Sequence, residues 1–235
     1  MRWSVQVQRL HPGAGAVGLA FATALTRHSY FRKEGRKKIA ILDLNEPPKL
    51  DKYIVNGPAD VPEQRTSTLT PSSLRFLTDI GVMQHVNDDR CASYHRMQVW
   101  EKDGSSFLAF EHPDNRSMGR TIENSHLVAA MYHLLKQEVA QKFSQDNVDF
   151  IFNDEIVTET DGKLKMKSGQ LVDYDLLVGS DGQRSKVKEI RGITSHGWSH
   201  NQKAIVRMFL MSRFVLLEQS ILPTLFGRDS LEMVH

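Results

Sequence analysis

The fold is decided near the N-terminus by the stretch Gly13-Ala14-Gly15-Ala16-Val17-Gly18. Its three glycines have the spacing that is typical of the turn between a strand and a helix in dinucleotide-binding α/β proteins. The first permits the tight turn, the second lets a pyrophosphate approach the backbone, and the third lets the helix pack closely on the sheet. We therefore predict that Gly13, Gly15 and Gly18 bind a nucleotide cofactor at a helix N-terminus, where free N–H groups attract phosphate.

The flanking residues supply the elements that such a turn needs. Residues 3–10 alternate as a strand does, residues 17–25 are small and apolar as in a closely packed helix, and residues 39–42 form a short apolar strand. Asp43 ends that strand, where a carboxylate accepts hydrogen bonds from an adenosine ribose. The alternative is a glycine turn with a structural role only. The polar end of the first strand departs from the pattern, and suggests that this strand is damaged or shifted in register.

Strands and helices alternate along the rest of the chain, which predicts an α/β fold. Thr70 can cap a helix that has Pro71 at its first position and ends at Gly81. Residues 45–62 contain four prolines and should form a loop. A longer helix begins at Asn124, with one apolar face made of Leu127, Met131, Leu134, Leu135 and Val139. The other predicted elements are strands at 97–100, 106–110, 148–152, 163–167 and 176–179 and a short helix at 183–190.

A second candidate nucleotide segment runs from Asp173 to Ser185. An apolar strand leads into Gly-Ser-Asp-Gly at residues 179–182 and then into the start of a helix. The segment resembles the Asp-Gly motif of flavin-dependent aromatic hydroxylases. That resemblance implies that Asp181 and Gly182 contact FAD and help to shape the path of a reduced nicotinamide. The alternative is a surface turn with a helix cap.

Four further segments are similar to the hydroxylases of coenzyme Q (ubiquinone) biosynthesis, in particular their eukaryotic, mitochondrial type. They are residues 64–74, with the pattern R-x-S-x-L-x-P-x-S; 96–100, R-M-Q-V-W; 122–127, I-E-N-x-x-L; and 197–206, where His200 replaces the usual aromatic residue. The resemblance implies that Arg65 lies close to the flavin and that Asn124 faces the cofactor. It covers about residues 13–206.

This resemblance implies an α/β, Rossmann-like FAD-binding domain of the p-hydroxybenzoate hydroxylase type, interleaved with an incomplete substrate-domain sheet. The implied protein is an FAD-dependent monooxygenase that hydroxylates the ring of a polyprenylated phenol. Its electrons come from reduced nicotinamide or a ferredoxin-type donor. Its implied partners are other coenzyme Q biosynthesis proteins, and its implied place is the matrix side of the mitochondrial inner membrane, in peripheral contact. Only twelve residues precede Gly13, too few for a convincing presequence.

The family pattern ends near Val206. We expect one domain at residues 1–206 and an atypical tail at 207–235, and we expect this chain alone to bind FAD weakly or not at all and not to hydroxylate. Two alternatives stay open. One is an inactive nucleotide-binding fragment. The other is an NAD-dependent dehydrogenase, which the Asp-Gly segment disfavours.

Composition excludes several other classes. Thirty Lys and Arg against 28 Asp and Glu give no support to nucleic-acid binding. The single cysteine, Cys91, cannot form an internal disulfide or a multi-cysteine metal site, so we expect a structural or idle thiol. His126 and His133 lie two helical turns apart, but ordinary helix histidines explain them better than a metal pair. The basic run at residues 32–38 predicts a solvated loop, with a protein or lipid contact as the alternative. The sequence identifies no catalytic base.

Overall fold

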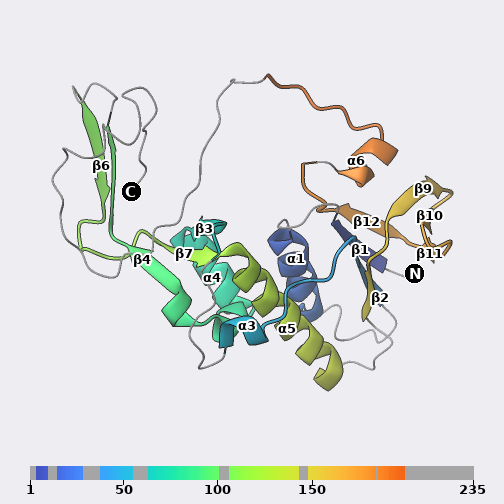
Figure 1. Cartoon of the computed structure of the whole chain (residues 1–235), viewed down its shortest axis with the longest axis horizontal. Coiled ribbons are helices and arrows are strands. Elements are labelled where there is room, and N and C mark those ends of the chain that lie inside the picture. The colour runs from blue at the N-terminus through green and yellow to red at the C-terminus, as the bar shows by residue number, and fades with distance from the viewer. Residues whose placement is uncertain are drawn as a thin grey trace.

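The protein is described by a computed structural model that covers residues 4–9, 15–28, 38–54, 63–100, 106–142, 148–183 and 185–198. Its centre is a four-stranded parallel sheet with the order β12-β1-β2-β8 (Figure 1). The strands are β1 (Ser4–Arg9), β2 (Lys38–Asp43), β8 (Val148–Phe152) and β12 (Leu176–Gly179). Because all four run in the same direction, their carboxyl ends meet at one edge of the sheet.

Each face of this sheet is covered by a different layer. Helices α1 (Ala16–Arg27) and α5 (Asn124–Lys142) lie on one side, and an antiparallel sheet of β9 (Ile156–Thr160), β10 (Lys163–Met166) and β11 (Leu171–Asp173) lies on the other (Figure 1). Successive side chains of a strand point to opposite faces. Ile39 and Ile41 of β2 therefore join the core under the helices, whereas Ala40 and Leu42 join the core under β9–β11.

A second group of elements follows β2. A short helix α3 (Asp51–Ile54) precedes a three-stranded antiparallel sheet with the order β3-β7-β4, made of β3 (Thr66–Leu69), β7 (Gly119–Glu123) and β4 (Cys91–Tyr94). Helix α4 (Pro71–Asp79) and the 3-10 helices η1 (Val82–His85) and η2 (Asp88–Arg90) connect β3 to β4. The α5 helix contacts both η1 and β7, so it joins this group to the parallel sheet.

A two-stranded hairpin of β5 (Arg96–Trp100) and β6 (Phe107–Glu111) extends away from the parallel sheet (Figure 1). In its register, Met97 lies opposite Phe110 and Val99 opposite Leu108, so one face of the hairpin is wholly apolar. Every described residue of β6 is exposed.

Position 119 on β7 requires a glycine because there is no room for a side chain, and not because of its backbone φ. A Cβ built there would lie 2.5 Å from the carbonyl oxygen of Leu69 and 2.7 Å from the ring of Tyr94. The absent side chain therefore lets Tyr94 lie across the middle strand of the sheet.

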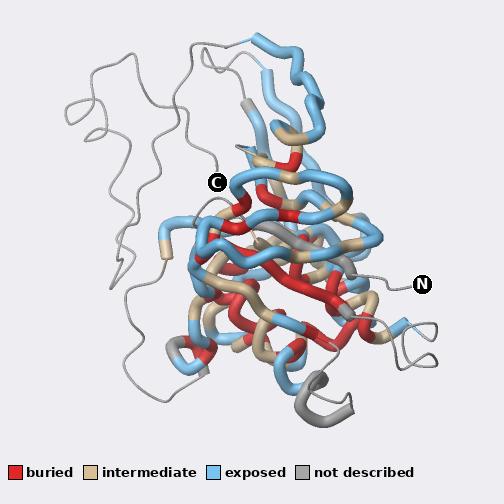
Figure 2. Tube along the Cα trace, turned by 90° about the vertical axis from the view of Figure 1, so that its right-hand side faces the viewer, coloured by how far each residue is buried: buried red, intermediate tan, exposed pale blue. Residues whose placement is uncertain are grey.

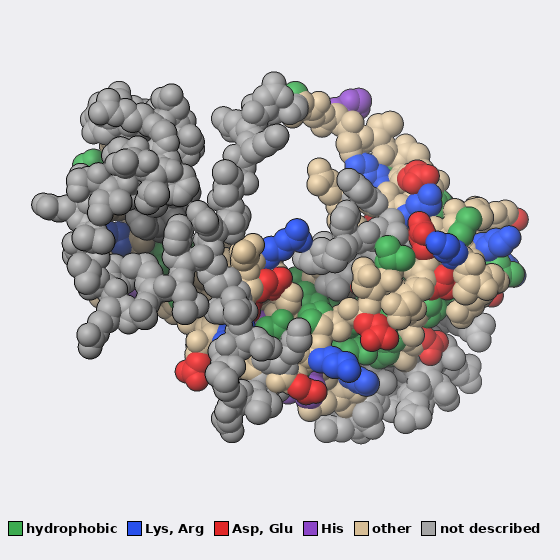
Figure 3. Space-filling model, viewed as in Figure 1, with side chains coloured by type: hydrophobic (Ala, Val, Ile, Leu, Met, Phe, Trp, Pro, Cys, Tyr) green, Lys and Arg blue, Asp and Glu red, His purple; other side chains and the backbone are tan. Residues whose placement is uncertain are grey.

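The buried residues gather in one body between the helices and the sheets (Figure 2). On the side shown in Figure 3, positive and negative side chains are interspersed over the described part of the surface, as the nearly balanced charge of the sequence suggests. Among the described residues, no helix is long and apolar enough to cross a membrane.

Most predicted elements are present, with some corrections. The first strand forms in spite of its polar residues, and pairs in parallel register with β2 and β12. The predicted loop at 45–62 was wrong in part, because α3 lies within it, and the predicted helix at 183–190 begins only at Lys186. The described part of α5 is buried on more than one face, since Val128, Ala129 and Ala130 are buried along with Leu127, Met131, Leu134 and Leu135, while the side chain of Val139 lies outside the described residues. Strands β3, β4, β7, β9 and β11 were not predicted.

The predicted cap of α4 is confirmed. The Thr70 side chain accepts a hydrogen bond from the Ser73 backbone N–H at 3.3 Å, Pro71 is the first helical residue, and Gly81 follows the helix with a φ of 78°. That φ lies in the left-handed region, which glycine adopts without strain.

We expect replacement of Thr70 by alanine to lower the free energy of unfolding by about 1 kcal/mol, because one N–H of the first turn loses its acceptor. Chemical denaturation measures the loss. The matched control is Ser72→Ala, at an exposed position in the same turn, which should change stability far less. Equal losses in the two variants would show that the cap contributes nothing.

Candidate nucleotide-binding site

The site lies at the carboxyl edge of the parallel sheet, where β1 leads to α1 and where β2 and β12 end. Gly15 and Gly18 of the glycine stretch, Asp43 at the end of β2 and Ser180 just after β12 line one pocket there. The rest of its lining is mainly apolar. The structure therefore brings the two segments predicted to share a nucleotide to the same edge of one sheet.

The N-terminus of α1 lies at this pocket and favours the binding of an anion there. Gly15 is the N-cap residue, no side chain of the described residues caps this end, and the first turn has no acidic residue. The unpaired N–H groups of a first turn and the positive end of the helix dipole favour a phosphate. Gly18, the third residue of α1, is buried, as expected for the glycine of the pattern that lets the helix pack closely on the sheet. Gly13 lies outside the described residues.

Two polar side chains face this region. Asp43 is only 4% exposed, and its Oδ1 accepts a hydrogen bond from the backbone N–H of Asn45 at 2.9 Å. This bond fixes the orientation of the carboxylate at the end of β2. The hydroxyl oxygen of Ser180 is buried and has no hydrogen-bond partner among the described residues. A buried polar atom without a partner is costly, and a ligand that hydrogen-bonds to it removes that cost.

Asp181 has the role that the sequence analysis gave only as the alternative for its segment, a turn with a helix cap. Its carboxylate is 1% exposed and accepts three hydrogen bonds from the start of α6 (Lys186–Ile190). The donors are the Ser185 hydroxyl at 2.5 Å and the backbone N–H groups of Lys186 at 2.6 Å and Val187 at 3.2 Å. The side chain of Asp181 therefore caps α6 from within the protein.

A second and larger cavity, about 620 Å³, lies along the outer side of β12 and α6. Asp181 and Gly182 line it, and Gly182 has a φ of 75° that suits glycine. At Gly179 an added Cβ would approach the Val187 side chain to 3.0 Å, so α6 packs closely on the end of β12. The Asp-Gly segment thus forms a tight turn between the two pockets.

Arg65 and Asn124 contact each other, but neither residue lines the pocket at the edge of the parallel sheet. The Asn124 backbone N–H donates to the Arg65 carbonyl at 2.9 Å, and the Ser67 hydroxyl donates to the Asn124 side chain at 2.5 Å. The Arg65 side chain is exposed. These contacts place both residues at the junction of β3 with the first turn of α5.

Ser180 was not among the predicted site residues. It belongs to the second candidate segment, in which only Asp181 and Gly182 were predicted to contact a cofactor. The available signal was its position, since the first residue after a parallel strand lies at the edge where such sheets bind ligands.

The contacts of Cys91 and His133 indicate structural roles for both side chains. Within the described residues, no group of three or more His, Cys, Asp or Glu side chains could hold a metal ion. Cys91 donates from its thiol to the Asn87 carbonyl at 3.4 Å, and burial raises the pKa of the thiol, which therefore stays protonated and unreactive. His133 contacts Gln137 and the His85 ring on the surface of α5.

Comparison with known proteins gives a consistent picture. No protein-family model matches the sequence. Mouse ubiquinone biosynthesis monooxygenase COQ6 is 28% identical over 212 residues, and the Escherichia coli 3-demethoxyubiquinol 3-hydroxylase is 24% identical over 198 residues. The chain resembles the ubiquinone biosynthesis monooxygenases. These alignments cover 85% and 83% of this chain but 42% and 46% of the two relatives, so the chain spans less than half of their length.

Solved structures with the same fold include PqsL from Pseudomonas aeruginosa, described as a probable FAD-dependent monooxygenase. It has a TM-score of 0.55 at 13% identity, over 83% of this chain and 47% of its own. The Diels-Alderase PyrE3 has a TM-score of 0.52 at 18% identity, over 80% of this chain and 34% of its own. Together with the parallel sheet, these similarities confirm the predicted fold class, the α/β fold of FAD-dependent monooxygenases.

The cap made by Asp181 can be tested directly. We expect Asp181→Ala to lower the free energy of unfolding by about 1–3 kcal/mol, because the donors at the start of α6 lose a buried, charged acceptor. The measurement is urea denaturation at neutral pH. The control is Asp175→Ala, an exposed residue just before β12. If the two variants are equally stable, the carboxylate does not stabilise this turn.

Proposed function

We propose that this chain supplies the FAD-binding part of a monooxygenase that hydroxylates the aromatic ring of a polyprenylated ubiquinone precursor. The observation that carries the proposal is the pocket at the sheet edge. There the N-terminus of α1, the oriented carboxylate of Asp43 and the Ser180 hydroxyl, which has no partner in the described part of the chain, face the same space. The resemblance to ubiquinone biosynthesis monooxygenases supports the reaction class.

The residue types at the site suit the adenosine half of FAD, and the pocket of about 10 Å³ between them widens when a nucleotide enters. In this proposal Gly13, Gly15 and Gly18 admit the pyrophosphate to the N-terminus of α1. Asp43 accepts hydrogen bonds from the ribose, and Ser180 satisfies its buried hydroxyl on the cofactor. Arg65, Asn124 and the Asp181-Gly182 backbone are proposed to contact FAD nearer its flavin end.

The protein's own contribution is binding, orientation and exclusion of water. The dipole of α1 stabilises the negative phosphates, and the Asn45 N–H keeps the Asp43 carboxylate turned to one direction. The apolar lining, which includes Leu19 and Ile41, keeps water away from the bound nucleotide. The flavin, when bound, supplies the oxygen chemistry, which no amino-acid side chain can perform.

The wider biological setting is proposed from the relatives alone. The mouse and Xenopus tropicalis relatives are named as mitochondrial proteins. We propose a mitochondrial location, on the matrix side of the inner membrane in peripheral contact. The proposed partners are reduced nicotinamide or a ferredoxin-type electron donor and the other coenzyme Q biosynthesis proteins.

A glycine substitution tests the pocket. We expect Gly15→Val to weaken binding of FAD or ADP by roughly tenfold or more, which corresponds to about 1.4 kcal/mol, because a branched side chain would fill the position of the pyrophosphate. Titration calorimetry measures the affinity. The control is Gly197→Val, where an added Cβ meets no atom within 4 Å among the described residues. Unchanged affinity in the Gly15 variant would contradict the proposed site.

Absorbance near 450 nm and complementation separate the candidate functions. A bound flavin absorbs there, whereas a dehydrogenase that uses the same glycine turn for NAD does not. Restoration of coenzyme Q synthesis in a hydroxylase-deficient cell by this 235-residue chain would establish an active monooxygenase. Binding of FAD without restoration would favour the alternative of a nucleotide-binding protein that does not hydroxylate.

A further inference from the structure

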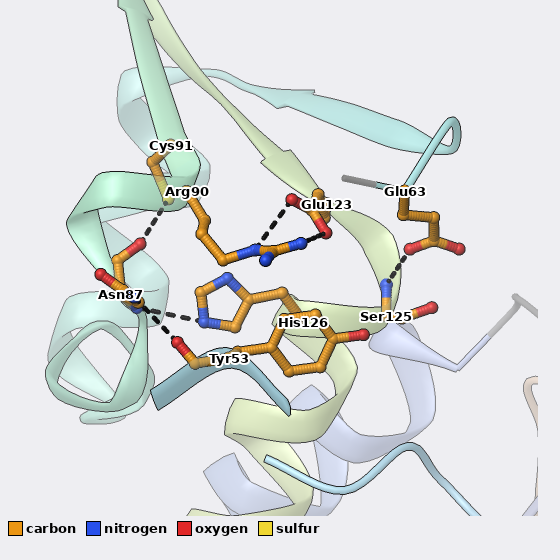
Figure 4. Close-up of polar contacts among 8 residues, drawn as sticks. All are labelled: Tyr53, Glu63, Asn87, Arg90, Cys91, Glu123, Ser125 and His126. Carbon is orange, nitrogen blue, oxygen red and sulfur yellow. Dashed lines mark hydrogen bonds and ion pairs between the residues drawn. The ribbon is translucent and has the colours of Figure 1, made fainter. Parts of the chain in front are cut away.

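The first turn of α5 carries a buried histidine that the proposed function does not use. His126 is 0% exposed, and its ring stacks on the ring of Tyr53 in α3, with centroids 4.7 Å apart and planes 10° apart (Figure 4). Its Nε2 accepts a hydrogen bond from the backbone N–H of Asn87 at 3.1 Å. His126 therefore contacts two segments that are distant from α5 in the sequence.

Asn87 uses each of its polar groups around this ring. Its side-chain Nδ2 donates to the Tyr53 carbonyl at 2.8 Å, and its Oδ1 accepts from the Asp89 N–H at 3.0 Å. Its carbonyl accepts from the Cys91 thiol. Through Asn87, the bond to His126 joins α3, the η1–η2 segment and α5 at a single point.

The geometry requires a neutral imidazole. Because Nε2 accepts a hydrogen bond, it bears no proton, so the neutral ring carries its proton on Nδ1. That Nδ1 is buried without a partner among the described residues. A second proton on Nε2 would point at the Asn87 N–H, and two donors would then face each other at hydrogen-bond distance.

The charged groups around the ring do not favour an imidazolium. Arg90 of η2 and Glu123 of β7 form a bidentate pair, with Nε–Oε1 at 3.0 Å and Nη2–Oε2 at 2.7 Å, and their side chains are 9% and 7% exposed. Glu123 raises the pKa of His126 and Arg90 lowers it, but burial is the largest influence and the pKa lies below its ordinary value.

The remaining titratable groups drawn in Figure 4 are Cys91, whose thiol keeps its proton because burial raises its pKa, together with Tyr53 and Glu63. The Tyr53 phenol keeps its proton, because burial raises its pKa. The Glu63 carboxylate accepts from the Ser125 N–H at 2.8 Å and thus caps the start of α5. None of the three offers a second negative charge to the ring, since Glu63 is turned to the helix backbone (Figure 4).

We propose that His126 is an acid-sensitive latch. In its neutral form it binds Asn87 and holds α3 and the η1–η2 segment against α5. Uptake of one proton from solvent at Nε2 breaks the bond to Asn87, and the segment from Val82 to Arg90 then opens together with α3.

The sign of the pH dependence follows from proton uptake on opening. The opened form has the ordinary pKa of histidine, about 6.5, and the closed form has a lower one. Above about pH 6.5 neither form binds the proton and opening is independent of pH. As the pH falls from there toward the pKa of the closed form, the opening equilibrium constant rises by up to about tenfold per pH unit. The stabilisation is thus present above the ordinary pKa and is lost in acid.

Hydrogen exchange at the Asn87 amide tests the latch. The protection factor, corrected for intrinsic exchange, is measured on the 235-residue chain between pH 7.5 and 5.5. We expect this protection factor to be constant above pH 6.5 and to fall below that pH by up to about tenfold per unit.

Two glutamine variants serve as the comparison. In His126→Gln the amide oxygen can still accept from Asn87 but does not titrate, so the fall in protection should disappear. His133→Gln, on the same helix, should behave as the parent protein. Equal slopes in the parent and in His126→Gln would overturn the proposal.

The tautomer provides an independent test that needs no variant. Nitrogen-15 NMR of the His126 ring at pH 7.5 should show Nδ1 protonated and Nε2 unprotonated. A proton on Nε2 at that pH would overturn the latch even if the glutamine variant failed to fold.

Discussion

The rest of the structure depends on the burial of β2 from both sides. Ile39 and Ile41 are covered by α1 and α5, while Ala40 and Leu42 are covered by β9–β11. Removal of apolar surface from water is the main favourable contribution to folding, and a strand buried on both faces contributes it twice. Because β2 is fixed in this way, Asp43 at its end is fixed as well. The position of the candidate site is therefore a consequence of core packing.

The sequence predicted the elements of this central layer because their signals are local and strong. The glycine stretch, the apolar run of β2 and the Thr70-Pro71 cap each determine a conformation from neighbouring residues alone. The missed strands β4, β9 and β11 are short and largely exposed, and their place depends on partners that are distant in the sequence. The α5 helix did not match a one-faced pattern, because α1, η1 and the strands surround it.

The candidate site could be predicted only in part for the same reason. Gly18 and Asp43 follow from spacing, since their roles derive from one turn and one strand end. Asp181 does not, because its carboxylate is directed by the position at which α6 begins, five residues later. The position of Ser180 after β12 indicates the binding edge of the sheet, but the burial of its hydroxyl and the lack of a described partner distinguish it from its neighbours. His126 likewise gives no sequence signal, because its partners Tyr53 and Asn87 come from two other segments.

The glycine of β7 has a consequence for how this sequence can change over time. At position 119 the space for a side chain is taken by the Leu69 carbonyl and the Tyr94 ring, and the nearer of the two is backbone that cannot rotate away. A replacement there would become acceptable only after a smaller residue had taken the place of Tyr94 and the β3 backbone had shifted. A single substitution at position 119 would therefore destabilise the fold and be selected against, although the residue lines neither pocket and performs no chemistry.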